Sequence, residues 1–215
     1  MYVGRIVAVG RTRAGMNAAL YRVSSRSFPN RMAVEVEGRL AVVPRPGHEG
    51  DLHKNPYIAY NCVRVARELA VATNGSQTDP IAEKLALGVP ARDALASVLL
   101  ALDFEKDALQ TPRIAGIVPR EGDVGWLAIV RHDALVVKAV PLEPGRAWYV
   151  ATYEHDDVRE AQRVDFDFDA PDAEACARFA VDGGRFAELE KPVTAAAALA
   201  SSRGFRLGTF LVNPS

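Results

Sequence analysis

The sequence predicts an α+β fold in which two antiparallel sheets pack face to face, with helix pairs on their outer faces. Three observations lead to this fold class. Strand-like runs follow one another with only short turns between them, which is typical of antiparallel hairpins. The helical runs come in pairs, so the chain order is strands, two helices, strands, two helices and a strand. That order lacks the regular strand–helix alternation of a parallel doubly wound sheet.

The amino-terminal third is expected to form hairpins. Its strand-like runs share alternating apolar residues bounded by turn residues, and they span 2–12, 18–26, 34–43 and 62–73. A turn at Glu37-Gly38 divides the third run, and residues 48–56 are expected to form a polar loop. The centre of the fourth run, at 67–70, also suits a helix, and the sequence leaves both alternatives open.

Two helices are expected in the middle of the chain. Asp79 and Pro80 supply an N-cap acid and a first-turn proline for the first helix, which Gly88 ends. Pro90 opens the second helix, whose leucines share one face with Val98. The strand-like runs that follow are separated by turn residues, and they span 113–118, 124–130, 134–140 and 148–153.

The last part of the chain is expected to supply the second helix pair and a closing strand. A helix is predicted to start at Pro171, to run through Phe179 and to end at 183–184, where two glycines follow one another. Residues 192–200 are rich in alanine, a strong helix former, and predict a further helix. Residues 205–212 resemble a strand.

Length and composition indicate one domain spanning residues 1–215. The net charge is only −1, so neither DNA nor RNA is expected as a partner. No segment has the roughly 18 uninterrupted apolar residues of a membrane helix, so no membrane partner is expected either. The two cysteines, Cys62 and Cys176, form neither a disulfide framework nor a metal knuckle, which favours a cytoplasmic protein with reduced thiols.

Four polar clusters lie at the ends of the predicted elements. The first, residues 22–31, holds three arginines, three serines and an asparagine. Arginine binds phosphate through two parallel charge-assisted hydrogen bonds, so this run indicates a small phosphorylated ligand in an otherwise neutral protein. Between them, the other three clusters supply tyrosine, glutamate, lysine and amide side chains, and they lie at 54–62, 73–79 and 103–113. Together the clusters suit chemistry on a nucleotide base. Arg22, Ser24 and Arg26 alternate along a strand, however, and also fit a solvated face.

Other site motifs are absent or weak. The chain has no GxGxxG after a strand and no GxxxxGK[ST], so neither a Rossmann site nor a P-loop site is supported. It has no GxSxG nucleophile elbow. Residues 48–53 carry two histidines and two acids, but their spacing is not that of a standard metal site, and a solvated loop is favoured. Cys62 is expected to be a buried thiol rather than a nucleophile.

The same clusters carry a resemblance to a known family. The chain resembles the archaeal-type IMP cyclohydrolase family in its opening MYVGR and in the strings YRVSSRSFPNR (21–31), NPYIAYNC (55–62), TNGSQTD (73–79), DFEKD (103–107) and TPRIA (111–115). The match covers residues 1 to about 115 and continues more weakly through 149–154 and 191–198.

The resemblance implies a four-layer αββα sandwich of the N-terminal-nucleophile hydrolase type, with mostly antiparallel sheets. It also implies the last step of purine synthesis, in which 5-formamidoimidazole-4-carboxamide ribotide closes to IMP and loses water. Hydrolases of that fold use an N-terminal Cys, Ser or Thr, whereas this chain has Tyr2, so covalent catalysis is not expected. The resemblance further implies a homo-oligomer, either a dimer or a tetramer.

The expected binding residues carry cationic, hydroxyl or amide groups. The 5′-phosphate and ribose are assigned to Ser24, Ser25, Arg26, Asn30 and Arg31. The carboxamide and formyl oxygens are assigned to Asn61, Asn74 and Ser76. Weaker binding candidates are Thr111, Arg113 and Tyr153. No metal or organic cofactor is expected to be required.

Four residues are candidates for the chemical steps. Tyr60 and Glu105 are expected to transfer protons, and the sequence does not say which is the acid and which is the base. Arg22 or Lys106 is expected to stabilise the oxyanion, and a cation beside Tyr60 would also lower its pKa from about 10. A placed acid or base contributes about 10²–10⁴-fold to the rate.

Two other functions stay open on the sequence alone. An amidohydrolase of the same fold would use Cys62 or a water molecule as its nucleophile. A non-catalytic purine nucleotide-binding protein would bind IMP without turning over the formamido ribotide.

Overall fold

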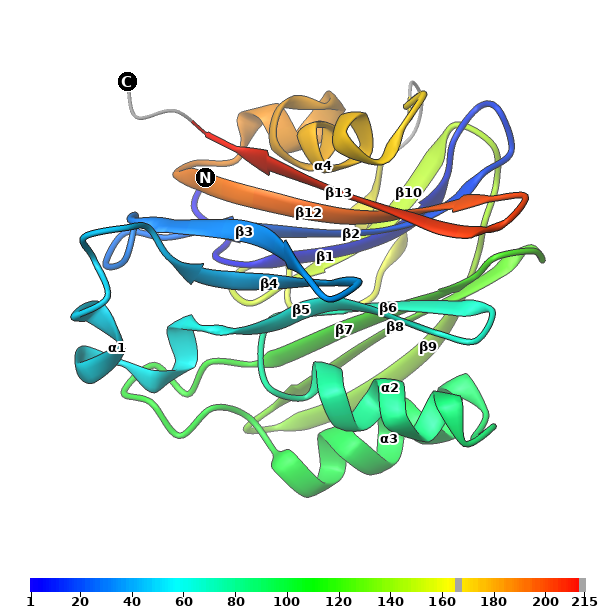
Figure 1. The fold of residues 1–215 in the computed structure, drawn as a ribbon. Helices are drawn as coiled ribbons and strands as arrows, with labels where there is room; N and C mark the ends of the chain where they lie inside the picture. Colours follow the sequence, from blue (N-terminus) through cyan, green and yellow to red (C-terminus); the bar gives the residue numbers. More distant parts are fainter. Residues whose placement is uncertain (165–167, 213–215) are drawn as a thin grey trace.

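The fold consists of two antiparallel sheets that face each other (Figure 1). The computed structural model describes residues 1–164 and 168–212. The six-stranded sheet contains β1 (Ile6–Arg11), β2 (Asn17–Ser24), β10 (Arg146–Ala151), β11 (Arg163–Val164), β12 (Pro192–Ser201) and β13 (Gly204–Leu211). The seven-stranded sheet contains β3 (Arg31–Val36), β4 (Arg39–Pro44), β5 (Tyr60–Ala66), β6 (Leu69–Thr73), β7 (Arg113–Pro119), β8 (Val124–Arg131) and β9 (Ala134–Pro141).

The strand orders explain how distant segments meet. The six-stranded sheet has the order β11-β10-β1-β2-β12-β13, so the amino-terminal hairpin lies between segments from the last third of the chain. The seven-stranded sheet follows the chain as a meander, β3-β4-β5-β6-β7-β8-β9. All of these strand pairs are antiparallel.

Helices cover the outer face of each sheet (Figure 1). The described residues form α1 (Asp51–Lys54), α2 (Thr78–Ala86), α3 (Ala91–Leu102) and α4 (Ala173–Asp182). The pair α2 and α3 packs on the seven-stranded sheet, whereas α4 and a 3₁₀ turn at Gly184–Glu188 pack on the six-stranded sheet. The predicted α+β class with two antiparallel sheets is therefore confirmed, but one outer face carries a single α-helix rather than a pair.

Three apolar cores hold these elements together. The central core lies between the two sheets, and one further core lies beneath the helices on each side. In β1, Val7 and Val9 face the central core, while Ile6 and Ala8 face the core beneath α4. This division follows from the two-residue period of a strand, in which successive side chains point to opposite faces.

The helix expected at residues 192–200 is wrong. The segment is β12, a central strand that pairs with β2 on one side and β13 on the other. Its alanines are buried on both faces, since Ala196 and Ala198 face the other sheet and Ala195 and Ala197 face α4. Alanine has the highest helix propensity, but propensity is only a weak preference per residue, which burial with full backbone pairing outweighs.

Smaller differences occur near the middle of the chain. The predicted polar loop at 48–56 contains α1, and a 3₁₀ turn at Pro56–Ile58 begins at its last residue. The N-cap of α2 is Gln77, so Asp79 lies in the first turn of the helix, where its carboxylate accepts hydrogen bonds from Asn61 and Arg64. The alternatives at 62–73 are decided in favour of the hairpin of β5 and β6.

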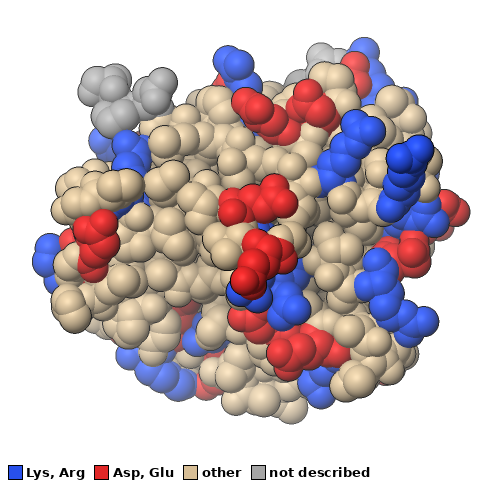
Figure 2. Space-filling view, viewed as in Figure 1, with Lys and Arg blue, Asp and Glu red and all other residues tan. Residues whose placement is uncertain are grey.

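The surface agrees with a nearly neutral chain. On the face seen in Figure 2, basic and acidic side chains lie interspersed. Among the described residues, no helix has both the length and the apolar character that crossing a membrane requires.

Small residues let α4 approach the six-stranded sheet closely. Gly208 of β13 pairs with Ala197 of β12, and both lie under the start of α4. A Cβ at position 208 would overlap the backbone of Ala173 and Glu174. Helix backbone cannot move aside without disturbing its own hydrogen bonds, so this contact needs a residue without a side chain.

Gly208→Ala is therefore expected to lower the free energy of unfolding by about 1–3 kcal/mol through overpacking. Denaturant unfolding followed by circular dichroism measures it. Gly50→Ala is the matched control, because a Cβ there meets nothing within 4 Å and Gly50 already has a φ of −60°. The control should stay within about 0.5 kcal/mol of the parent, and equal effects in both variants would contradict the close contact.

Candidate active site

Two adjoining cavities lie at one end of the sandwich. Loops from both sheets meet at that end, near α1 (Figure 1). The arginine chamber, of about 210 Å³, is lined by Arg5, Arg26 and Arg31 among others. The Tyr60 chamber, of about 170 Å³, is lined by Pro56, Tyr57, Ala59, Tyr60, Gly75, Ser76 and Glu105. Tyr57 and Glu105 line both cavities. Taken together, the chambers have the size of a small-molecule site, roughly 300–1,000 Å³.

The arginine chamber combines a buried cation with an exposed one. Arg31 is 3% exposed, and its Nε donates to the carbonyl of Phe28 at 3.1 Å. Arg26 lies at the rim with a side chain that is 62% exposed, and its guanidinium sits 4.1 Å from the centroid of the Tyr2 ring. The buried cation is fixed in orientation, whereas the rim cation stays accessible to a ligand that enters from solvent.

A tight turn after β2 brings these residues to the chamber. The Ser25 hydroxyl accepts a hydrogen bond from the backbone N–H of Phe28 at 3.0 Å, a side-chain turn that serine readily forms. The chain then crosses to the other sheet, where the backbone N–H of Arg45 donates to the carbonyl of Asn30 at 2.9 Å. The run 25–31 thus spans the gap between the two sheets at the edge of the cavity.

Glu105 is the buried acid of the site. It follows α3, which ends at Asp103 with a φ of 57°, and its backbone N–H donates to the carbonyl of Thr111 at 2.8 Å. The carboxylate accepts a hydrogen bond from Arg5 at 3.2 Å through Oε2. Its Oε1 lies 3.8 Å from Arg113 and has no hydrogen-bond partner among the described residues. Burial raises the pKa of Glu105, although Arg5 and Arg113 oppose that rise.

A network of buried hydrogen bonds fixes Arg113, the cation beside Glu105. The side-chain oxygen of Asn74 accepts from Gln77 at 2.7 Å, and the Gln77 side-chain oxygen accepts from Arg113 at 3.0 Å. Gly75 leaves room for this network, since a Cβ there would lie 2.7 Å from the Gln77 oxygen and 2.9 Å from the Arg113 guanidinium. Arg113 is therefore held in one orientation by partners that are themselves fixed.

Tyr60 is the second titratable group that reaches a chamber. It begins β5, is partly exposed to the Tyr60 chamber, and its hydroxyl lies 2.5 Å from the hydroxyl of Tyr21. Burial raises the pKa of Tyr60, while the positive charges of Arg31 and Arg5 and the bond to Tyr21 lower it in part. The net rise above 10 means that Tyr60 is a neutral phenol at neutral pH and can donate a proton.

Relatives of known name match nearly the whole chain. The model of a family described as IMP cyclohydrolase-like protein matches residues 2–204. The chain is 45% identical to an IMP cyclohydrolase of Methanosphaera stadtmanae, over 92% of this chain and 94% of the relative. It is 46% identical to an IMP cyclohydrolase of Methanocella arvoryzae and 47% identical to one of Natronomonas pharaonis, each over 98% of both chains.

The chain belongs to the IMP cyclohydrolase-like family. The matched range contains every residue that lines the two chambers. In this member of the family, seven of the residues selected from the sequence line the chambers: Ser25, Arg26, Arg31, Tyr60, Ser76, Glu105 and Tyr153. Two more contact lining residues directly, since Thr111 bonds to Asp107 and to Tyr153, and Arg113 lies beside Glu105.

Arg22 and Ser24 lie elsewhere, which corrects the roles expected for them. Both point to the α4 side of β2, and the Arg22 guanidinium donates to the Ser24 hydroxyl at 2.9 Å. It also donates to the carbonyls of Phe186 and Leu189 and to the last turn of α4. Burial lowers the pKa of Arg22 to about 10, so it stays charged at neutral pH. Arg22 is engaged in fixing the α4 segment and does not reach either chamber.

Four further expectations need the same correction. Lys106 extends into solvent, where it pairs with Asp103 and lies 3.6 Å from the centroid of the Phe104 ring. The amide of Asn61 is held by Asp79. Asn30 and Asn74 do not line a chamber either, and Asn74 is fully buried with its amide bonded to backbone and to Gln77.

Sequence reasoning missed several lining residues. Arg5 is the most important of them, because it pairs with Glu105 and reaches the arginine chamber. Burial disfavours its charge, but Glu105 and the neighbouring tyrosines outweigh this and raise its pKa. The opening string MYVGR contains both Tyr2 and Arg5, but its apolar residues predict a strand, and a local pattern does not show that Arg5 pairs with Glu105. Tyr57 and Asp107 also line the arginine chamber, and both lie within the polar clusters.

Neither residues 48–53, which carry two histidines, nor the two cysteines line the chambers. Among residues 1–164 and 168–212, no group of three or more His, Cys, Asp or Glu side chains is placed to hold a metal ion. Cys62 lies in β5, next to β4, and is fully buried in the central core. Its thiol donates to the carbonyl of Leu40, and burial raises the pKa of that thiol. A buried thiol of raised pKa is a poor nucleophile, which argues against an amidohydrolase that uses Cys62.

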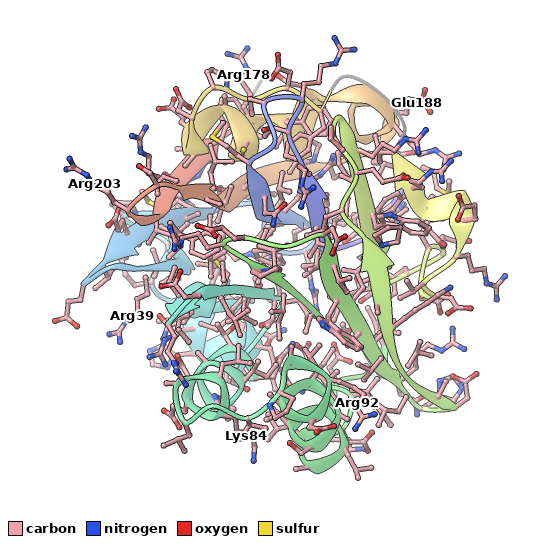
Figure 3. The ribbon with its side chains drawn as sticks, turned by 90° about the vertical axis from the view of Figure 1, so that its right-hand side faces the viewer. Arg39, Lys84, Arg92, Arg178, Glu188 and Arg203 are labelled. Carbon is pink, nitrogen blue, oxygen red and sulfur yellow. The ribbon has the colours of Figure 1, made fainter. Side chains whose placement is uncertain are left out.

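Arg22→Met is expected to lower the free energy of unfolding by about 2–4 kcal/mol, because several buried carbonyls would lose their donor. Folded Arg22→Met should still bind IMP, since the chambers do not include this residue. Chemical denaturation measures the free energy of unfolding, and calorimetry measures the binding of IMP. Arg203→Met, an exposed arginine in the β12–β13 turn, is the control and should be neutral (Figure 3). Loss of IMP binding at unchanged stability would restore the ligand role expected for Arg22.

Proposed function

We propose that this chain is an IMP cyclohydrolase, which closes 5-formamidoimidazole-4-carboxamide ribotide to IMP with loss of water. Membership of the IMP cyclohydrolase-like family supports this activity. The observation that carries it is the shared position of Glu105, which lines both the chamber of the arginines and the chamber of Tyr60. A nucleotide bound by its phosphate in the first chamber would bring its base to the two proton-transfer groups.

The 5′-phosphate is assigned to the arginine chamber. Arg26 and Arg31 come from one short turn, and Ser25 and Ser27 line the same cavity. Guanidinium groups bind phosphate oxygens in pairs, and serine hydroxyls supply further donors. The ribose is assigned to the part of the cavity between the phosphate-binding residues and Tyr57, which lines both chambers.

Glu105 and Tyr60 suit the two proton transfers of ring closure. The carboxamide nitrogen must attack the formyl carbon, lose a proton and give a hydroxyl-bearing adduct. Glu105, buried but paired with Arg5, accepts the nitrogen proton, and Tyr60, a neutral phenol, donates a proton to the formyl oxygen. In the second step the protonated Glu105 gives its proton to the leaving hydroxyl, and the Tyr60 phenolate takes the N–H proton of the former formamido nitrogen, which forms the C=N bond while the former carboxamide nitrogen keeps its one remaining proton. Both side chains end in their starting states, and one water is released.

Cations near these groups stabilise the charges that develop. Arg5 and Arg31 act on the Tyr60 oxygen, and Arg113 lies 3.8 Å from the unpaired Oε1 of Glu105. Arg5, Arg31 and Arg113 therefore replace Arg22 and Lys106 as the candidates that stabilise the developing charge. Oε1 is buried and has no hydrogen-bond partner among the described residues, and an N–H of the carboxamide that reached it would satisfy it.

We also propose that the fold is the αββα sandwich of the N-terminal-nucleophile hydrolase type. The helices on both outer faces of two antiparallel sheets support this assignment. Tyr2 stands where those hydrolases carry a nucleophile, and here its ring stacks 6.2 Å from that of Tyr153 at the arginine chamber. This position therefore contributes a surface for contact rather than a nucleophile. A single domain over residues 1–215, a homo-oligomer and a cytoplasmic location stay predictions.

The direct test is an absorbance assay of the purified protein with the formamido ribotide, run with and without a chelator. We expect conversion to IMP at the same rate in both conditions, because Glu105 and Tyr60 suffice for the proton transfers. IMP binding without turnover would instead favour a non-catalytic nucleotide-binding protein.

Arg26→Ala is expected to raise KM about 10- to 100-fold with little change in kcat, because a phosphate contact holds the substrate equally in the ground and transition states. Arg92→Ala is the matched control. Arg92 is similarly exposed, with 67% of its side chain accessible, and it lies on α3 in the outer helix layer (Figure 3). Steady-state kinetics compares the two variants, and equal KM values would contradict the phosphate assignment.

Glu105→Gln is expected to lower kcat about 10²–10⁴-fold with a much smaller effect on KM. The pH dependence follows from the raised pKa of Glu105. A base must be ionised, so kcat/KM of the unaltered enzyme should fall as pH falls through a pKa above the ordinary 4.5 of glutamate. An acid limb at or below that value, measured between pH 4 and pH 8, would argue against Glu105 as the base.

A further inference from the structure

The hydroxyl of the buried Tyr21 contacts the hydroxyl of Tyr60, the proposed proton donor. Tyr21 lies on the face of β2 that points between the sheets, is 0% exposed, and lines neither chamber. Its hydroxyl lies 2.5 Å from that of Tyr60, and the two rings meet edge to face at 6.3 Å. Tyr60, in contrast, is partly exposed to its chamber.

Burial decides which hydroxyl donates. Within the described part of the chain, Tyr60 is the hydrogen-bond partner found for the Tyr21 hydroxyl. If Tyr60 donated to Tyr21, the Tyr21 proton would be buried without an acceptor, which is costly. If Tyr21 donates, its proton is satisfied and the Tyr60 proton is left to point into the chamber, where a ligand can accept it. The second arrangement satisfies both groups.

We propose that Tyr21 is a positioning residue for ring closure, whose hydroxyl donates to the Tyr60 oxygen and directs the Tyr60 proton toward the formyl oxygen of the substrate. The inference rests on the proposed function. When Tyr60 gives up its proton, the Tyr21 O–H is already aimed at the phenolate that forms. A donor that needs no rearrangement at that moment stabilises the charge most effectively. Consecutive O–H groups that donate in the same direction also polarise one another.

The charged surroundings support the same direction of donation. Arg31 and Arg5 favour the ionised form of Tyr60, and Cys62 disfavours it. Arg5 and Arg31 act on Tyr21 as well, but its complete burial and its nearness to Tyr60 keep its pKa well above 10. Because Tyr21 is fully buried whereas Tyr60 reaches its chamber, the charged form is less costly at Tyr60, and Tyr21 keeps its proton as the donor.

Tyr21→Phe tests the proposal, because it removes the hydroxyl and keeps the ring in the central core. We expect kcat to fall about 10- to 100-fold while KM stays within about twofold, since a hydrogen bond to a developing charge is lost. A second measurement needs no turnover. Incorporating 3-fluorotyrosine at position 60 lets ¹⁹F NMR follow the ionisation of that phenol, and Tyr21→Phe should raise its pKa by about one unit.

Tyr149→Phe is the matched control. Tyr149 is also 0% exposed, and its hydroxyl bonds to Nδ1 of His155 at 2.7 Å, in the core beneath α4. It should change neither kcat nor the pKa at position 60. An unchanged or lowered pKa in Tyr21→Phe would overturn the proposal, and so would a raised pKa with an unchanged kcat. Failure of the unaltered protein to turn over the ribotide would instead overturn the proposed function, while the NMR titration would still report the direction of the hydrogen bond.

Discussion

The site depends on a single carboxylate that is buried between two sheets. Glu105 is 1% exposed, and an ionised carboxylate can remain in such a place only when cations and hydrogen bonds compensate for lost water. Arg5 comes from the segment that leads into β1, and Arg113 begins β7, so each sheet contributes one of the cations. The acid can occupy its position only when the two sheets have packed together.

The need to compensate the buried carboxylate explains the residues around Arg113. Gln77 and Asn74 hold Arg113 in place through hydrogen bonds, and position 75 is a glycine because a side chain there would overlap Gln77 and Arg113. The compensation is also incomplete, since Oε1 has no hydrogen-bond partner among the described residues and burial keeps the pKa of Glu105 raised. An acid with one unsatisfied oxygen is suited to accept a proton or a donor from a ligand.

The two titratable groups differ in role because their ordinary acidities differ. Burial raises the pKa of both Glu105 and Tyr60, and the charges of Arg5 and Arg31 oppose that rise in both. Since the rise of Glu105 starts from 4.5 and that of Tyr60 from 10, the carboxyl suits the base and the phenol suits the proton donor. The arginines add a third element, because their charges act on Tyr60, on Glu105 and on any phosphate bound in the adjoining chamber.

Local patterns in the sequence predict most of the strands, the α2–α3 pair and the residue types of the site. They do so because alternation, turn residues and proline are local signals, and because phosphate and proton chemistry need particular side chains. Packing in three dimensions set the rest. It made β12 a strand, since burial and backbone pairing between β2 and β13 outweigh the helix propensity of its alanines. It also divided the arginine run, because strand alternation turns Arg22 toward α4, whereas Arg26 and Arg31 lie beyond the end of β2 and reach the cavity. Arg5 and Tyr21 gain their importance from partners about 100 and 39 residues away, a separation that no local pattern in the chain can reveal.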